Sequence, residues 1–169
     1  MLVYEPFAAR SVSNPGAALR SLAHKSVARS TRLSEIVSRM PEIAIVEDEP
    51  NILTSLRLNF RQWGYQVRTY SDPCVALPEL VARPPDALIL NGRMPGMHGL
   101  ELYRRLRASS NVPVIFLSAS AEAIADELAR CGTPAAAYFD KPFWLSDLQN
   151  VVEDVLGDGR LPAGVVHTI

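Results

Sequence analysis

Residues 85–99, PDALILNGRMPGMHG, decide the fold of this chain. The apolar run 87–90 is too short for a helix and is typical of a parallel strand that is buried on both faces. The polar loop 91–96 follows it and leads to a helical pattern from about Leu100 to Ala108. The stretch therefore predicts one strand–loop–helix unit.

The same unit recurs on both sides of this stretch. Short apolar or alternating runs predict four further strands, at 43–46, 65–70, 114–117 and 136–139. Helical patterns follow them, beginning near Ile52, Pro73, Ala121 and Leu145. Pro78 predicts a kink or a short first turn in the helix that begins near Pro73. Five strand–helix units predict an α/β protein whose parallel sheet is covered by helices on both faces.

The composition fits one domain of ordinary size with some extra sequence. The 169 residues are 48% hydrophobic and 21% charged, and no apolar run approaches the roughly 18 residues that cross a bilayer. The N-terminus is a poor signal peptide because Glu5 interrupts a short apolar stretch. Cys74 and Cys131 lie far apart and outside any metal-binding pattern, which favours reduced thiols in or near the core. We therefore expect a cytoplasmic protein without a membrane segment.

Charge is unevenly distributed and indicates a boundary near residue 40. Residues 1–40 hold six Lys/Arg and two Glu, whereas the remaining 129 residues hold eleven Lys/Arg and sixteen Asp/Glu. We expect residues 1–40 to be an N-terminal extension with a helix within 16–39, unless Met40 is the true start. Residues 41–156 are expected to form the folded domain, and the Gly- and Pro-containing residues 157–169 a flexible tail.

Polar residues follow four of the five predicted strands. Glu47 and Asp48 come after the first strand, Asn91 after the third, Ser118 after the fourth and Lys141 after the fifth. The carboxyl ends of parallel strands meet at one edge, where function gathers in open α/β sheets. Carboxylates suit Mg²⁺, and a hydroxyl with an ammonium could bind phosphoryl oxygens. An acid after a strand is usually only a solvated helix start, but the four strand ends together indicate a site.

Four segments carry a family resemblance: IAIVEDEP at 43–50, PDALILNGRMPGMHG at 85–99, PVIFLSA at 113–119 and YFDKPF at 138–143. They resemble the signature segments of the response-regulator receiver domains of two-component signalling, over about 115 residues. The shorter stretches NILTS, ARPPD and VPVIFLS resemble receivers that precede a winged-helix domain in alphaproteobacterial transcriptional regulators. The resemblance implies a flavodoxin-like, doubly wound, five-stranded parallel sheet with strand order 2-1-3-4-5 and five helices.

The resemblance also implies roles for the matched positions. Glu47 and Asp48 are similar to the acidic pair that holds Mg²⁺. Ser118 resembles the hydroxyl that hydrogen-bonds the phosphoryl group, and Lys141 the lysine that pairs with it. Tyr138 resembles the aromatic switch residue that rotates between the two states.

One position departs from the family pattern. The phosphate-accepting aspartate stands four residues before the proline of the MPG segment, and here that residue is Asn91. An amide oxygen is a poor nucleophile, and the lost charge should weaken Mg²⁺ binding. Asp86 cannot substitute, because it lies at the opposite end of the strand, about 16 Å away at ~3.3 Å per residue. We therefore expect a pseudo-receiver without a catalytic residue, unless the sequence is in error at this position.

Arg93 lies two residues after Asn91 and suggests a replacement for the cation. We hypothesise that its guanidinium pairs with Glu47 or Asp48 in the acidic pocket. The alternative is an ordinary loop arginine that faces solvent.

The connection within residues 131–138, CGTPAAAY, looks two residues longer than the family pattern. In the family the fourth and fifth helices and the fifth strand form the surface that partners and dimers use. A homodimer through this surface is therefore expected with an altered geometry, or the longer loop is a harmless variant.

These observations favour a phosphorylation-independent signalling or protein-interaction module that is not an enzyme and requires no cofactor. Its expected partner is a histidine kinase, a related response regulator or another signalling protein. Direct DNA binding is not expected, because no basic recognition helix is present and the N-terminal basic residues are scattered. The alternatives are an Mg²⁺-dependent phosphoacceptor or phosphoryl-transfer protein that uses another residue, and a small-molecule sensor, which lacks the support of a Gly-rich phosphate loop.

Overall fold

The computed structural model describes residues 40–157 and 164–167. The helix that we expected within 16–39, and the alternative that Met40 is the start, concern a segment outside this part of the chain. In the described part, no helix is long and apolar enough to cross a membrane.

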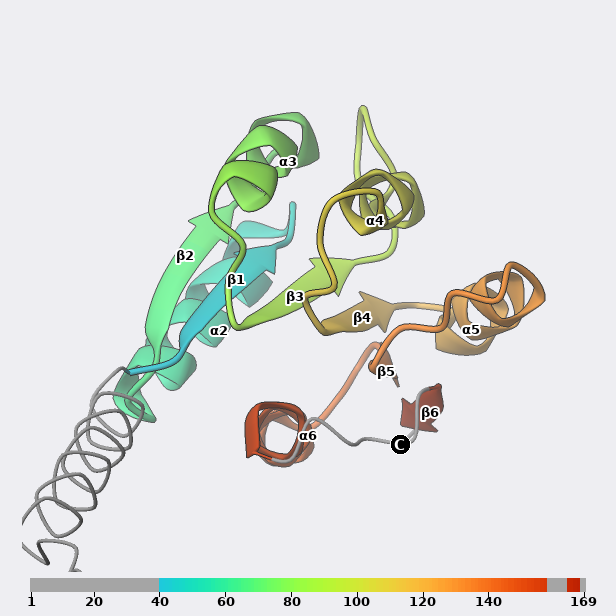
Figure 1. Cartoon of the computed structure of the whole chain (residues 1–169). Coiled ribbons are helices and arrows are strands. Elements are labelled where there is room, and N and C mark those ends of the chain that lie inside the picture. The colour runs from blue at the N-terminus through green and yellow to red at the C-terminus, as the bar shows by residue number, and fades with distance from the viewer. Residues whose placement is uncertain (1–39, 158–163, 168–169) are drawn as a thin grey trace, which may run out of the picture. The chain divides into compact units, whose positions relative to one another are not determined.

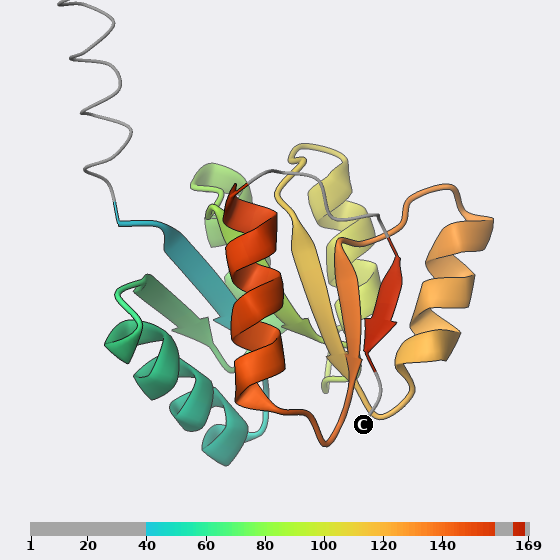
Figure 2. The same ribbon diagram turned by 90° about the horizontal axis from the view of Figure 1, so that it is seen from below.

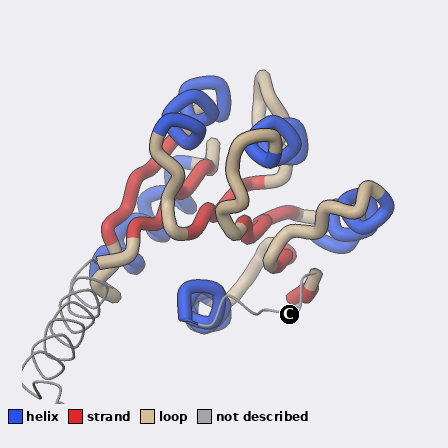
Figure 3. The backbone as a smooth tube through the Cα atoms, in the orientation of Figure 1, coloured by secondary structure: helices blue, strands red, loops and turns tan. Residues whose placement is uncertain are grey.

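A parallel sheet forms the centre of this part of the chain (Figures 1 and 3). Its strands are β1 (Glu42–Val46), β2 (Gln66–Tyr70), β3 (Ala87–Asn91), β4 (Val114–Ser118), β5 (Ala137–Asp140) and β6 (Val165–His167). The helices are α2 (Pro50–Gln62), α3 (Pro73–Ala82), α4 (Gly99–Arg107), α5 (Ala121–Arg130) and α6 (Leu145–Gly157). The strand order is β2-β1-β3-β4-β5-β6, and every neighbouring pair is parallel. The flavodoxin-like prediction is confirmed, with one strand more than expected.

Helices cover both faces of the sheet because the side chains of each central strand alternate between two apolar clusters. Ile43, Ile45 and Ile89 face α2 and α6, and pack on Phe60 and Val152. The alternate residues of the same strands face α3, α4 and α5. Figure 2 shows α2 and α6 in front of the strands. Burial of β1, β3 and β4 on both faces explains why these strands read as continuous apolar runs.

Pro78 lies inside α3, which begins with a turn capped by Asp72 and continues to Ala82, so the short first turn is not found and the kink stays a prediction. A second local expectation was wrong. Both cysteines are exposed rather than in the core. Cys74 lies in the first turn of α3, and Cys131 is the C-cap residue of α5.

The strand β6 corrects the expectation of a flexible tail for residues 165–167, while 158–163 and 168–169 lie outside the described residues. Val165–His167 pair in parallel with Ala137–Phe139 of β5. The apolar pair Val165-Val166 favours a strand, and without it β5 would be an open sheet edge. Three residues are too few to show a periodic pattern in the sequence, which is why the strand was missed.

Candidate functional site

The carboxyl ends of β1 and β3 place Glu47, Asp48 and Asn91 together. β1 and β3 are paired neighbours, with Val46 opposite Leu90, so the residues that follow them meet at one edge. This is the topological switch point of the sheet, where such folds bind ligands. Glu47 is 0% exposed and Asn91 is 6% exposed, whereas Asp48 remains partly exposed at the rim of the site.

The side-chain amide of Asn91 occupies the middle of this oxygen-rich pocket. Its Nδ2 donates to Glu47 Oε1 at 2.9 Å, to Asp48 Oδ1 at 2.7 Å and to the Arg93 carbonyl at 2.9 Å. An amide has two N–H hydrogens, so the three acceptors share them. Its Oδ1 points the other way and lies 3.5 Å from the backbone nitrogen of Arg93. The amide is therefore oriented by acceptors on one side and a donor on the other.

The arrangement does not fit a magnesium ion. Two carboxylates and a backbone carbonyl are the oxygen ligands that Mg²⁺ prefers, but here the N–H group of Asn91 donates to all three. An N–H group cannot ligate a cation. Binding would require the amide to turn its Oδ1 inward and lose these hydrogen bonds, and it would offer two negative charges instead of three.

Lys141 supplies the positive charge of the site. Its Nζ donates to Glu47 Oε2 at 2.8 Å and to Glu49 Oε1 at 3.0 Å. Burial raises the pKa of the Glu47 carboxyl above its ordinary value of 4.5, and the hydrogen bond and charge of Lys141 oppose that rise. Sequence reasoning missed Glu49, which caps α2 without a side-chain capping bond and pairs with Lys141 instead.

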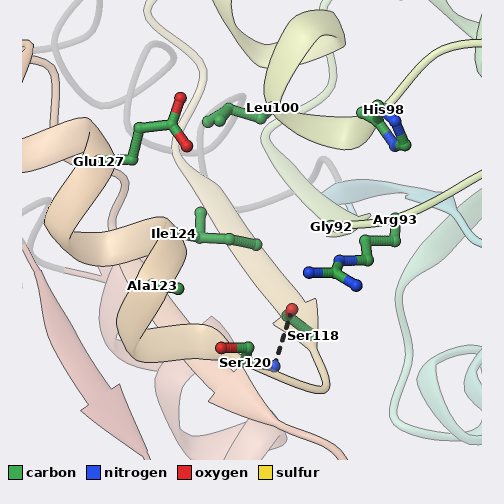
Figure 4. A pocket seen from close by; sticks show the side chains of 9 residues that line it. All are labelled: Gly92, Arg93, His98, Leu100, Ser118, Ser120, Ala123, Ile124 and Glu127. Carbon is green, nitrogen blue, oxygen red and sulfur yellow. Dashed lines mark hydrogen bonds between the residues drawn. The ribbon is translucent and has the colours of Figure 1, made fainter.

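The ion pair that we hypothesised for Arg93 is not formed. Within the described residues, the Arg93 guanidinium is exposed and pairs with neither Glu47 nor Asp48. It borders a cavity of about 480 Å³ between the starts of α4 and α5. Figure 4 shows its side chain extending toward Ser118 along the cavity wall. Asn91 and Lys141 already contact both carboxylate oxygens of Glu47 and one carboxylate oxygen of Asp48.

Ser118 lies at the carboxyl end of β4, buried and close to Lys141. Its Oγ accepts a hydrogen bond from Ser120 N at 3.1 Å, and its carbonyl accepts from Lys141 N at 2.7 Å. Gly92 leaves room for the hydroxyl, because a Cβ there would stand 3.2 Å from Ser118 Oγ and 2.5 Å from Ile124 Cδ1. The structure thus brings Ser118 to the same strand ends as Lys141.

Tyr138 is fully buried and belongs to the apolar cluster on the sheet face that α3, α4 and α5 cover. Its hydroxyl accepts a hydrogen bond from Ala135 N at 2.8 Å, and its ring stacks on Phe116 at 5.9 Å between centroids. Burial raises the pKa of the Tyr138 hydroxyl. Ala135 belongs to the connection between α5 and β5, so that loop holds the tyrosine through a backbone donor.

Asp86 lies at the opposite end of β3, as its place in the sequence predicted. It accepts a hydrogen bond from Glu42 N, at the start of β1, at 2.7 Å. It therefore cannot act at the strand ends where Asn91 lies.

Comparison with known proteins gives one family. The model of the family described as response regulator receiver domain matches residues 43–153. The transcriptional regulatory protein KdpE of Mycobacterium tuberculosis is 36% identical over 108 residues, 64% of this chain and 47% of that protein. The phosphate regulon transcriptional regulatory protein PhoB of Rhizobium meliloti is 37% identical over 120 residues, 69% of this chain and 52% of that protein. The chain spans about half the length of these relatives.

Solved structures agree with this fold. The receiver domain of the sensor histidine kinase PA1611 from Pseudomonas aeruginosa, with magnesium in its active-site cleft, is 30% identical with a TM-score of 0.62. The match covers 71% of this chain and 100% of the PA1611 receiver chain. The response regulator TrrA from Thermotoga maritima, solved with magnesium and beryllofluoride, is 29% identical with a TM-score of 0.61, covering 69% of this chain and 100% of its own.

Proposed function

This chain belongs to the response regulator receiver family, and we propose that it acts as a phosphorylation-independent interaction module in two-component signalling. The observation that carries the proposal is the Asn91 amide. The resemblance matches Asn91 to the phosphate acceptor, and its amide donates to Glu47, Asp48 and the Arg93 carbonyl. The amide oxygen is a poor nucleophile, and the N–H hydrogens engage the oxygens that would otherwise be offered to a cation.

A receiver without its chemical trigger is set by packing or by a partner. Receivers are two-state modules, and a ligand shifts such an equilibrium only as far as it binds one state better. Tyr138 is buried, and its hydroxyl accepts a hydrogen bond from Ala135 N. The proposed module presents the surface that this position of Tyr138 sets, and a protein that prefers this surface binds without prior phosphorylation.

The partner class that we propose is a helical segment of a histidine kinase or of another signalling protein. A cavity of about 370 Å³ lies between α2 and the start of α6, and Ile52, Phe143 and Leu145 contribute its apolar lining. Trp144 beside it is 64% exposed. An apolar groove with an exposed aromatic residue is the kind of surface that takes the apolar face of an amphipathic helix. The transcriptional names of KdpE and PhoB belong to proteins of which this chain matches 47% and 52%.

Beryllofluoride tests the independence from phosphorylation. It mimics an aspartyl phosphate, and the TrrA structure contains it together with magnesium. Addition of Mg²⁺ and beryllofluoride to this chain is expected to leave the amide NMR signals of Ser118 and Tyr138 in place, because no carboxylate is available at position 91.

The Asn91→Asp variant is the matched control. It restores the carboxylate and is expected to give saturable shifts at the same two signals. A saturable shift in the chain with Asn91 would instead favour the alternative, a receiver that takes the phosphoryl group on another residue with Mg²⁺, and the proposal would fail.

A further inference from the structure

The strand β6 is held on the outer edge of β5 by more than backbone pairing. It runs parallel to β5, with Val166 opposite Tyr138 and His167 opposite Phe139. Figures 1 and 2 show it beside β5 on the side away from β4. The His167 ring stacks on the Phe139 ring at 4.4 Å between centroids and 8° between planes.

Successive residues of this short strand contact opposite faces of the sheet. Val166 packs against the apolar cluster that contains Tyr138. Phe139, on which His167 stacks, belongs to the cluster on the other face. Since side chains alternate along a strand, three residues are enough to engage both faces.

A further contact links β6 to the tyrosine through a single loop residue. Gly164 N donates to the Ala135 carbonyl at 3.2 Å, and Ala135 N donates to the Tyr138 hydroxyl at 2.8 Å. Gly164 has a φ of +96°, a conformation that residues with a Cβ rarely adopt. Gly164, directly before β6, therefore holds Ala135 in place, and Ala135 in turn holds the Tyr138 hydroxyl.

Without β6, the outer edge of β5 would present unpaired N–H and C=O groups. It would also expose the apolar surfaces that Val166 and His167 cover. Such an edge is a docking surface for another strand, in which backbone bonds give affinity and side-chain pockets give specificity. The sequence of β6 indicates the ligand that this edge accepts: a short parallel strand with a β-branched residue against Tyr138 and an aromatic ring against Phe139.

We propose that the outer edge of β5 is a strand-docking surface and that residues 164–167 of the same chain are its resident occupant. The segment closes the edge to other strands and holds Tyr138 in its buried position through Ala135. This role does not depend on whether position 91 accepts a phosphoryl group. A competing strand gains the edge only after the segment leaves, and its arrival is coupled to the hydrogen bond at Tyr138.

Two chain lengths test the proposal. A chain that ends at residue 163 lacks the occupant, whereas a chain that ends at His167 keeps it and is the matched control. In the shorter chain the Ala135 amide is expected to exchange its hydrogen at least about tenfold faster, measured by NMR. The same chain is expected to bind a fluorescent peptide of residues 163–169 in an anisotropy titration, and the control and the full chain are expected to bind it poorly.

The full-length Val166→Asp variant guards against a folding defect in the shorter chain. It places a carboxylate against the Tyr138 cluster, so it should release the segment and bind the peptide as well. Unchanged Ala135 exchange and no peptide binding in both variants would overturn the proposal. A concentration-dependent dimer of the full chain, with the strand exchanged between copies, would overturn the assignment to the same chain.

Discussion

The carboxamide of Asn91 differs from a carboxylate by one group, an NH2 in place of an oxygen. An oxygen there would add a third acceptor beside Glu47 and Asp48, and a cation would be needed to hold the three together. The NH2 group instead donates to both acids. The pocket therefore holds its two acids with the Asn91 amide and one cation, Lys141, which pairs with Glu47.

The buried Glu47 carboxyl makes the free energy of unfolding depend on pH. Burial raises the pKa of its carboxyl, so the folded chain holds that proton more tightly than the unfolded chain does. Its contribution to the free energy of unfolding is full below pH 4.5 and is lost as the pH rises through the folded pKa. Each pH unit that separates the folded from the unfolded pKa of Glu47 corresponds to about 1.4 kcal/mol in the free energy of unfolding.

The Glu47→Gln variant removes that titration while keeping a side-chain oxygen for the Asn91 amide. In urea unfolding, the stability of the original chain relative to the variant is expected to fall as the pH rises above 4.5, and then to level off. If the relative stability increased over the same range, the hydrogen bond and charge of Lys141 would outweigh burial and lower the pKa of Glu47.

Asn91-Gly92 is the only Asn-Gly pair of the sequence. An Asn-Gly pair is susceptible to deamidation. In a flexible chain the Gly92 nitrogen attacks the Asn91 side-chain carbon, ammonia leaves, and water opens the resulting succinimide to aspartate or isoaspartate. In the folded chain Gly92 N instead donates to the Leu117 carbonyl at 2.8 Å, and the amide is held by its hydrogen bonds.

We therefore expect the folded chain to keep Asn91 under conditions in which the urea-unfolded chain loses it. The readout is the mass of the peptide that contains Asn91, and the peptide with Asn59-Phe60 serves as the internal control. Equal rates in the two states would show that the fold does not restrain this amide.

At the scale of elements, the contact between the end of β3 and the start of α4 leaves no room for a side chain. A Cβ on Gly99 would stand 2.0 Å from the Asn91 carbonyl oxygen and 3.2 Å from Gly92 Cα. These are backbone atoms, so the two elements would have to separate. We expect Gly99→Ala to lower the free energy of unfolding by about 3 kcal/mol.

Gly157→Ala is the control for this substitution, because a Cβ at the end of α6 would meet nothing within 4 Å. It should leave urea unfolding almost unchanged. A Gly99→Ala variant as stable as this control would show that β3 and α4 can part without loss.

The sequence predicted the elements whose side chains carry a clear pattern. Buried parallel strands read as short apolar runs, and this was enough to place β1, β3 and β4. The strand β6 could not be predicted, because three residues carry no period and their strand conformation depends on β5. The exposure of Cys74 and Cys131 also depends on packing that the local sequence does not contain.

At the scale of the molecule, the parallel topology explains how much of the site could be predicted. Once the strands were ordered, their carboxyl ends had to bring Glu47, Asn91 and Ser118 to one edge. The partners of each side chain could not be read from the sequence, because they depend on distances of a few tenths of an ångström. Lys141 therefore contacts Glu49, which was missed, and Arg93 does not form the ion pair that was expected.

We propose that this receiver cannot take a phosphoryl group at position 91. The direct test is incubation with acetyl phosphate and Mg²⁺ followed by intact-mass spectrometry, on protein whose Asn91 peptide has been confirmed as undeamidated. We expect no mass gain in this chain and a gain of one hydroxylamine-sensitive phosphoryl group in the Asn91→Asp variant. Such a phosphoryl group on the chain that still carries Asn91 would contradict the account.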